Sequence, residues 1–195
     1  MLNNTTTTPS QNQPKLLNAK DPFKIGYWNV RSLYQIGKQA QVCREMSNYG
    51  IHILGISECR WTGSGKLYLR NDKKHIIYSG RPDLHMEGVA IIMTSQAEKA
   101  LLSWESVNER IITARFQTRF FKLSIIQCYA PTNDASDLSK DTFYNTLVDV
   151  LNLVPKHDII IVMGDFNAKI GDDNRGAEKH VGKYGIGELN QMGKD

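Results

Sequence analysis

Polar side chains that could act on a phosphate follow four apolar segments of this sequence. Asn29 follows KIGYW, Glu58 follows ILGIS, Tyr129 follows SIIQC, and Asp165 follows IIIVMG. Asn167 comes two residues later, in the motif GDFNA. A strand fixes its own backbone, so a polar residue at its carboxyl end is held in place while its side chain faces the crevice where α/β proteins bind ligands. These five residues are therefore candidates for one shared site.

Each candidate also has an ordinary structural explanation. A glutamate at a strand end is more often a cap or a surface charge, an asparagine more often a turn residue, a tyrosine more often a core aromatic, and Gly-Asp-x-Asn more often a tight turn. Taken together, however, the candidates form an oxygen-rich set: two carboxylates, two amides and a phenol, all expected at strand ends of the same sheet. Mg²⁺ prefers oxygen ligands and is usually held by one or two carboxylates together with substrate phosphate oxygens. The set predicts a Mg²⁺ site beside a phosphate, with Mn²⁺ as an alternative, and neither zinc nor a small-molecule cofactor.

The residue pattern predicts the elements that position these groups. Strands are expected over 24–30, 51–57, 75–80, 88–94, 110–117, 121–130 and 158–163, and helices over 36–49 and 137–154. The first helix should bury Ile36, Ala40, Cys43 and Met46, and the second should end at Pro155. The middle of the chain is expected to be antiparallel and to contain no helix. This order predicts an α/β fold built in layers rather than a doubly wound parallel sheet.

Composition indicates one globular domain with a core, because 41% of the 195 residues are hydrophobic and 23% are charged. No apolar run approaches the ~18 residues of a membrane span, so no membrane partner is expected. Residues 1–22 form a polar tail that we expect to be disordered. They lack the pattern of a secretory signal, so we expect an intracellular protein, nuclear or cytoplasmic, that is not secreted. The three cysteines are scattered and predicted to be reduced, buried thiols: Cys43, Cys59 and Cys128.

Positive charge is concentrated in one part of the chain. The formal net charge is +4, and between residues 60 and 122 eleven Lys or Arg residues face six Asp or Glu residues. A basic and aromatic stretch follows Glu58 and comprises Arg60, Trp61, Lys66, Arg70, Lys73 and Lys74. Such a stretch suits phosphates along a duplex, so DNA is the expected partner, although an ordinary solvated loop is the alternative. No base-reading motif is present, so specificity would come from DNA shape or a nicking preference.

Five motifs stand in an order and spacing that resemble a known superfamily. They are WNVRSL (28–33), SECRW (57–61), EGVAII (87–92), CYAPT (128–132) and GDFNA (164–168). Together they resemble the endonuclease/exonuclease/phosphatase superfamily, most closely the apurinic-type endonuclease domain of non-LTR retrotransposons. The resemblance implies a four-layer α/β sandwich of two mixed, largely antiparallel sheets flanked by helices, and metal-dependent phosphodiester hydrolysis. Arg31 and Thr132 stand where the DNA-repair branch tends to have aspartate and asparagine, which favours the retrotransposon branch.

The resemblance also implies a role for each candidate residue. Glu58 matches the glutamate that binds Mg²⁺, and Asn29 matches the asparagine beside the metal and the scissile phosphate. Tyr129 matches the tyrosine that contacts the phosphate, and Asp165 matches the aspartate that orients or deprotonates the attacking water. Asn167 matches the amide that holds the phosphate oxygens. Further contacts with the substrate are expected from Arg31, Arg60, Trp61 and Thr132.

The superfamily pattern continues beyond GDFNA to further strands and a closing Ser-Asp-His, and none of the five histidines of this chain lies in that context. We therefore expect a domain over 23–195 that lacks its C-terminal part, with an incomplete second sheet and little or no nuclease turnover. The expected function is a DNA-nicking endonuclease of retrotransposon origin, weak or inactive, in a monomeric chain. One alternative is a non-catalytic module that binds DNA or a protein. Another is a phosphatase or sphingomyelinase-like hydrolase, which a deep pocket or an exposed apolar rim would favour, whereas a basic channel would favour the nuclease.

Overall fold

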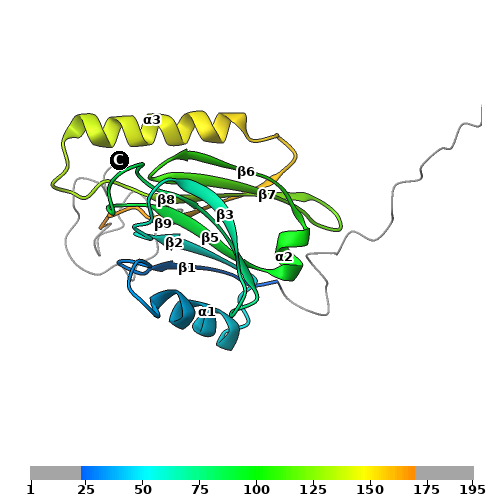
Figure 1. Cartoon of the computed structure of the whole chain (residues 1–195). Helices are drawn as coiled ribbons and strands as arrows, with labels where there is room; N and C mark the ends of the chain where they lie inside the picture. The colour runs from blue at the N-terminus through cyan, green and yellow to red at the C-terminus, as the bar shows by residue number, and fades with distance from the viewer. Residues whose placement is uncertain (1–22, 170–195) are drawn as a thin grey trace, which may run out of the picture.

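Two sheets packed face to face form the centre of the protein in a computed structural model, which describes residues 23–169 (Figure 1). The expected tail (1–22) and the segment 170–195 lie outside the described residues. The first sheet has the strand order β1-β2-β5-β4-β3 and the second has the order β6-β7-β8-β9. The strands are β1 (Ile25–Asn29), β2 (Ile53–Ser57), β3 (Ser64–Leu69), β4 (Lys74–Ser79), β5 (Val89–Thr94), β6 (Leu101–Asn108), β7 (Ile111–Gln117), β8 (Lys122–Tyr129) and β9 (Ile159–Asp165). The helices are α1 (Lys38–Asn48), α2 (Ser95–Lys99) and α3 (Asp137–Leu153).

Strand pairing is antiparallel except at two places. β1 pairs with β2 in parallel, and β8 pairs with β9 in parallel. Helix α1 covers the outer face of the first sheet, and α3 covers the outer face of the second (Figure 1). The arrangement therefore has four layers, which confirms the predicted α/β sandwich of two mixed, largely antiparallel sheets.

Apolar side chains fill the space between each pair of layers. Strand β5 illustrates this, because Val89, Ile91 and Met93 face the second sheet whereas Ala90 and Ile92 face α1, and all five are fully buried. Burying one such side chain contributes about 1.5–3 kcal/mol. A strand covered on both faces needs apolar residues at every position, which explains the continuous apolar runs seen in the sequence.

Helix α1 begins later than the sequence predicts. Its N-cap is Gly37, whose φ of 80° lies in the left-handed region, so the helix starts at Lys38. Ile36 therefore precedes the helix and is fully exposed, and Ala40 lies on the solvent side. The prediction that these two residues face the core is wrong; the buried face is formed by Val42, Cys43 and Met46.

The middle of the chain contains three elements that the sequence did not predict. The expectation of no helix there is wrong, because Thr94 caps α2 by accepting a hydrogen bond from the Ala97 N–H (3.2 Å). β3 and β6 are edge strands, so much of their surface is solvated and their apolar signal is weak. The remaining predicted strands and helices are confirmed within a few residues, and all three cysteines are free and buried as predicted.

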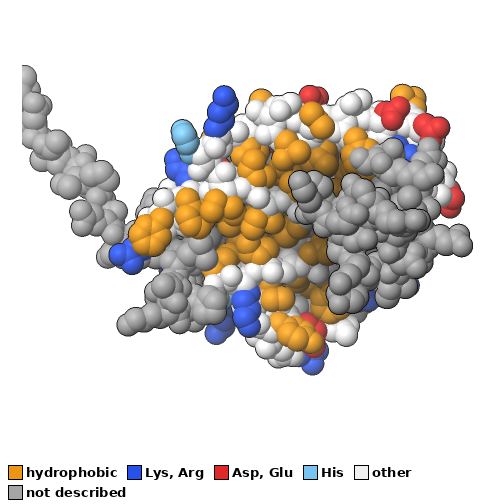
Figure 2. Space-filling view, turned by 180° about the vertical axis from the view of Figure 1, so that it is seen from behind, with side chains coloured by type: hydrophobic (Ala, Val, Ile, Leu, Met, Phe, Trp, Pro, Cys, Tyr) orange, Lys and Arg blue, Asp and Glu red, His pale blue; other side chains and the backbone are white. Residues whose placement is uncertain are grey.

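The strands β1 and β9 end the two sheets on the same side of the sandwich and lie against each other. Both carry exposed apolar side chains, namely Tyr27, Trp28, Ile159, Ile160 and Val162. Hydrophobic side chains also gather on the face of the molecule shown in Figure 2. No helix between residues 23 and 169 is long and apolar enough to span a membrane.

Candidate active site

The four strands that carry the predicted site residues end at one edge of the sandwich. Asn29 lies opposite Ser57 at the end of the β1–β2 pair, and Tyr129 lies opposite Asp165 at the end of the β8–β9 pair. The two pairs belong to different sheets, and the Ser57 hydroxyl joins them by donating to the Cys128 carbonyl oxygen (2.9 Å). The site is therefore built where the two sheets meet.

One amide links the two carboxylates of the site. Asn29 Nδ2 donates to Glu58 Oε1 (2.9 Å) and to Asp165 Oδ2 (2.8 Å). The orientation of this amide is fixed because Asn29 Oδ1 accepts a hydrogen bond from the Arg31 N–H (3.0 Å). Asn29 thus holds Glu58 and Asp165 beside each other and turns its own oxygen away from them.

Glu58 is kept ionised by its neighbours. Burial alone would raise the pKa of this carboxyl, but the hydrogen bonds from Asn29 and Arg60 and the positive charge of Arg60 lower it below its ordinary value. Arg60 Nη2 lies 2.9 Å from Glu58 Oε2. Glu58 and Arg60 also have φ values of 57° and 56°, a left-handed backbone that costs a residue with a side chain roughly 1–2 kcal/mol. Strain of this kind is typical of functional loops whose geometry is held by their surroundings.

Asn167 ties together the loops that follow β8 and β9. Its backbone N–H donates to Asp165 Oδ1 (3.0 Å), and its side-chain Nδ2 donates to the Ala130 carbonyl oxygen (2.8 Å). The Ala130 N–H donates in turn to the Asp165 carbonyl oxygen (2.8 Å). Asp165 therefore receives hydrogen bonds on both carboxylate oxygens, one from Asn167 and one from Asn29.

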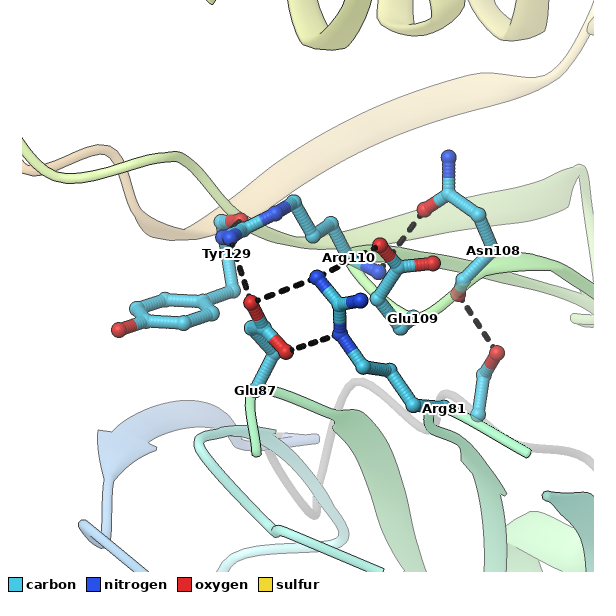
Figure 3. A network of polar contacts seen from close by, with 7 residues as sticks. Arg81, Glu87, Asn108, Glu109, Arg110 and Tyr129 are labelled. Carbon is cyan, nitrogen blue, oxygen red and sulfur yellow. Dashed lines mark hydrogen bonds and ion pairs between the residues drawn. The ribbon is translucent and has the colours of Figure 1, made fainter. Parts of the chain in front are cut away.

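A network of charges at the junction of the sheets holds Tyr129 (Figure 3). The Arg110 guanidinium lies 5.3 Å from the centre of the Tyr129 ring, and its Nη1 donates to the Tyr129 carbonyl oxygen (3.2 Å). Arg110 Nη2 pairs with Glu87 (3.0 Å), which also binds Arg81 (2.6 Å). Burial raises the pKa of the Tyr129 phenol, and the negative charge of Glu58 raises it further against the opposing charge of Arg110. The phenol is therefore protonated at neutral pH and can donate a hydrogen bond to an anion.

A second layer of residues lies directly beneath the site, on the inner faces of the same strands. Tyr27 and Gly55 pair in the first sheet, and Gln127 and Met163 pair in the second. Gln127 is fully buried, and its Nε2 donates to Ser57 Oγ (3.1 Å) and to the Cys128 carbonyl oxygen (3.1 Å). It fits only because residue 55 has no side chain, since a methyl group there would overlap Gln127 Oε1 and lie 2.6 Å from Met163 Cε. Burial raises the pKa of the neighbouring Tyr27 phenol to about 12.

An open cleft adjoins Glu58 and Tyr129. Its volume is about 320 Å³, and its lining includes Glu58, Arg60, His85, Glu87, Arg110, Tyr129 and Thr132. Arg60 and Thr132, both predicted to contact the substrate, thus lie in this cleft. Arg31 is exposed on the loop after β1. Trp61 is half-buried and packs edge-on against Tyr78, with ring centres 5.1 Å apart.

The basic stretch that follows Glu58 is divided by the fold. Lys66 forms an ion pair with Glu98 on α2 (2.7 Å), which neutralises the positive charge of Lys66. Arg70, Lys73 and Lys74 surround the turn between β3 and β4, whereas the site lies at the other end of these strands, where Ser79 and Ser57 both pair with Val89. Within residues 23–169, these lysines and arginines therefore do not form one surface with Arg60, and the described part of the cleft is not a long basic channel.

Several residues of the site region were not singled out from the sequence. Tyr27 and Gln127 stand two positions before Asn29 and Tyr129, and the two-residue period of a strand places them on the same face, so a signal for them existed. Glu87 begins the motif EGVAII but was given no role, whereas His85 and Arg110 belong to no motif; all three reach the cleft from loops between strands. Their position depends on how distant strands pair, which no local pattern reveals.

The donor set fits a hard divalent cation. Within residues 23–169, no group of three His, Cys, Asp or Glu side chains could hold a metal by itself. Glu58 and Asp165 nevertheless lie close together, because a carboxylate oxygen of each accepts a hydrogen bond from the same amide nitrogen, Asn29 Nδ2. One or two carboxylates completed by water and phosphate oxygens are the usual protein ligands of Mg²⁺, whereas a zinc site is built mainly from His and Cys.

Comparison with known proteins agrees with this fold. Residues 26–180 match the sequence profile described as the Endonuclease/Exonuclease/phosphatase family, and the chain belongs to this family. It is 38% identical over 185 residues to "Craniofacial development protein 2" of Bos taurus, covering 95% of this chain and 30% of that protein. The same protein of Tragulus javanicus is also 38% identical over 185 residues, covering 95% of this chain and 31% of that protein. The chain thus spans about a third of the length of these relatives.

Solved structures share the fold at low sequence identity. The 3′ phosphatase NExo from Neisseria, bound to a product DNA hairpin, superposes with a TM-score of 0.60 at 21% identity, over 78% of this chain and 62% of that one. An AP endonuclease from Archaeoglobus fulgidus superposes with a TM-score of 0.56 at 19% identity, over 76% of this chain and 59% of that one. The endonuclease domain of TRAS1, a telomere-specific non-LTR retrotransposon, superposes with a TM-score of 0.54 at 16% identity, over 75% of this chain and 61% of that one. These matches concern the fold alone, and the family inferred from the five motifs is confirmed by the sequence profile and the 38% identical relatives.

Proposed function

We propose that this chain carries a divalent-metal-dependent phosphodiesterase site that nicks DNA and derives from a retrotransposon endonuclease. The observation that carries the proposal is the Asn29 amide, which brings Glu58 and Asp165 together beside Tyr129 and an open cleft. NExo with its DNA hairpin and the TRAS1 endonuclease domain support DNA as the substrate class by analogy of fold. A DNA substrate implies an intracellular place of action, nuclear or cytoplasmic.

The residues would divide the work of hydrolysis as follows. A Mg²⁺ or Mn²⁺ ion bound by Glu58 would neutralise charge that develops on the phosphoryl oxygens. Asp165, oriented by hydrogen bonds to both of its oxygens, would aim and deprotonate the attacking water. The protonated Tyr129 phenol would donate a hydrogen bond to a phosphate oxygen, and Arg60 at the cleft wall would attract the phosphate electrostatically. No covalent intermediate is needed, because water would attack the phosphorus directly; the bond from phosphorus to the leaving oxygen would break, and that oxygen would take a proton from solvent.

Nicking of supercoiled plasmid in Mg²⁺ tests the proposal. We expect slow nicking by the parent chain, stopped by EDTA, and a loss of about 100-fold or more in Asp165→Asn, because a water-orienting carboxylate typically contributes that much. Asp141→Asn is the matched control, since Asp141 is an exposed aspartate on α3, outside the site. Binding of Mn²⁺, followed by its electron paramagnetic resonance signal, should weaken in Glu58→Gln.

Two results would count against the proposal. Equal nicking by the parent and by Asp165→Asn would mean that the activity does not come from this site. No nicking together with Mn²⁺ binding that Glu58→Gln leaves unchanged would identify a non-catalytic module.

A hydrolase of lipid or small phosphates is the second candidate, because the mouth of the cleft has an apolar rim. Met86 lines the cleft and has 52% of its surface accessible, and Tyr34, whose ring contacts the cleft residue His85, has 64% accessible. Such a rim would suit a lipid surface as well as a nucleobase. Release of phosphocholine from sphingomyelin vesicles, measured beside plasmid nicking on the same preparation, separates the two candidates.

A further inference from the structure

Two aromatic rings are stacked at the rim of the cleft. The ring centres of Tyr34 and His85 lie 4.2 Å apart with their planes tilted by 38°. Tyr34 comes from the loop after β1 and has 64% of its surface exposed, and His85 comes from the loop before β5. His85 also lines the cleft that contains Glu58 and Tyr129. The pair thus stands between solvent and the candidate active site.

Both loops are fixed by backbone hydrogen bonds to the segment around Glu58. The Leu33 N–H donates to the Cys59 carbonyl oxygen (3.0 Å), and the Arg60 N–H donates to the Glu87 carbonyl oxygen (2.9 Å). Leu33 is buried beneath its loop, which anchors the neighbouring Tyr34. His85 Nδ1 lies 2.9 Å from the Arg60 carbonyl oxygen, so the imidazole is held by the same segment that carries Glu58. The rings are therefore already oriented before any ligand arrives, which lowers the cost of binding one.

We propose that the Tyr34–His85 pair is a stacking platform for an unpaired nucleobase. Exposed aromatic faces stack on bases of any sequence, whereas bases within a duplex already stack on each other and become accessible only when unpaired or flipped out. The platform rests on the proposed function and narrows it, because it selects strands with single-stranded or distorted character.

Charge beside the rings favours a nucleic acid over a lipid surface as the occupant. Arg60 supports His85 through its carbonyl oxygen and carries a guanidinium at the cleft wall. Arg31 is exposed on the same loop as Tyr34. A base on the platform would place its own phosphate near these cations and near Glu58, which would hold the metal. A lipid surface would need no fixed stack of rings, only a broad apolar area.

Fluorescence anisotropy with labelled oligonucleotides tests the platform on the whole chain, with Ca²⁺ in place of Mg²⁺ to suppress cleavage. The probes are a short single strand of thymidines and a strand of equal length made of abasic sites, which keeps the phosphates but lacks the bases. We expect the base-bearing strand to bind about tenfold more tightly, as one good base–aromatic stack typically provides. Tyr34→Ala should remove this preference, and Tyr34→Phe should keep it because the ring remains.

The chain offers a matched control in a second tyrosine–histidine pair. Tyr68 and His75 stack with ring centres 4.7 Å apart and a tilt of 38°, and Tyr68 is 51% exposed. They lie toward the β3–β4 turn, at the end of these strands remote from the site. Tyr68→Ala should therefore leave the preference for the base-bearing strand unchanged.

The possible outcomes are distinct. Equal binding of both strands by the parent chain, or binding of neither strand, would overturn the platform, whereas the proposed function is decided separately by plasmid nicking. Equal losses in Tyr34→Ala and Tyr68→Ala would also overturn it, because the effect would not be specific to the cleft. Binding to phosphatidylcholine–phosphatidylserine vesicles that depends on Tyr34, with no preference between the strands, would assign the rim to a lipid surface instead.

Discussion

Replacing Gly55 with alanine should destabilise the protein, because the neighbouring strands leave no room for a methyl group. A Cβ at position 55 would overlap Gln127 Oε1 and would lie 2.6 Å from Met163 Cε and 3.0 Å from Gln127 Cδ. Gln127 is fully buried between the sheets, so its side chain has no open space into which it can move. The substitution must therefore displace Gln127, separate the sheets locally, or both.

The magnitude follows from these contacts. Overpacking a dense core costs about 1–3 kcal/mol, and each hydrogen bond that Gln127 loses to Ser57 or Cys128 adds about 1 kcal/mol. We expect the free energy of unfolding to fall by about 2–5 kcal/mol. For a chain of this size, that corresponds to a decrease of roughly 5–15 °C in melting temperature. Mn²⁺ affinity should fall as well, because Gln127 contacts the backbone and hydroxyl groups that lie beside Glu58 and Tyr129.

Thermal unfolding followed by circular dichroism measures the effect, and a double substitution tests its cause. Gln127→Ala removes the atoms that the new methyl group would meet, so Gly55→Ala combined with Gln127→Ala should be less destabilised than the sum of the two single changes by about 1–2 kcal/mol. Gly65→Ala is the matched control in β3, where the nearest atom to a new Cβ is the Tyr78 hydroxyl at 3.2 Å, and it should change stability by less than about 0.5 kcal/mol. A Gly55→Ala protein that melts with the parent, or strict additivity in the double variant, would refute the reasoning.

Two further predictions concern a partly buried ion pair and the thiols. Asp158 binds Arg115 through both oxygens (2.7 and 2.9 Å), and the hydrogen bond from Arg115 lowers the pKa of this carboxyl. A lowered pKa stabilises the fold above the unfolded value of about 3.9, and this contribution is lost as the pH falls through the folded value. Asp158→Asn should therefore melt below the parent at neutral pH, with the difference shrinking toward about pH 3; a constant difference would contradict this. Burial raises the pKa of the thiols of Cys43, Cys59 and Cys128 to about 12, 11 and 12, respectively. Ellman's reagent should therefore react with these thiols only after the protein is unfolded in urea. Rapid reaction with the native protein would contradict this prediction, because it would show that a thiol is accessible.

The location of the site could be predicted from the sequence because its residues directly follow apolar strands. Asn29, Glu58, Tyr129 and Asp165 each lie at or just after the end of such a segment, and parallel pairing brings these ends to one edge. The orientation of the Asn29 amide could not be predicted, because it is set by a turn at Arg31 and by two carboxylates from different sheets. The chemical roles of these residues remain predictions until the variants are measured.

The layered fold could also be predicted, but its edges could not. Strands covered on both faces, such as β2 and β5, have continuous apolar residues that identify them. The edge strand β3 has exposed Lys66, Leu67 and Tyr68 in succession, so it shows neither a continuous apolar run nor a clear alternation. Ile36 had the spacing of a core residue, yet Gly37 delays the helix and leaves it in solvent.

The hydrogen bond between Asn29 and Asp165 joins residues that are 136 positions apart in the chain. Contacts this distant in sequence form late in folding, because the loop between them must first be closed. Each sheet supplies only part of the site, with Asn29 and Glu58 from the first and Tyr129 and Asp165 from the second. A chain in which both sheets have formed but have not docked would therefore contain all four side chains and still lack the assembled site. Under the proposed function, catalysis would therefore depend on the docking of the two sheets, and cutting the chain between β5 and β6 would divide the site into two parts that function only when they reassemble.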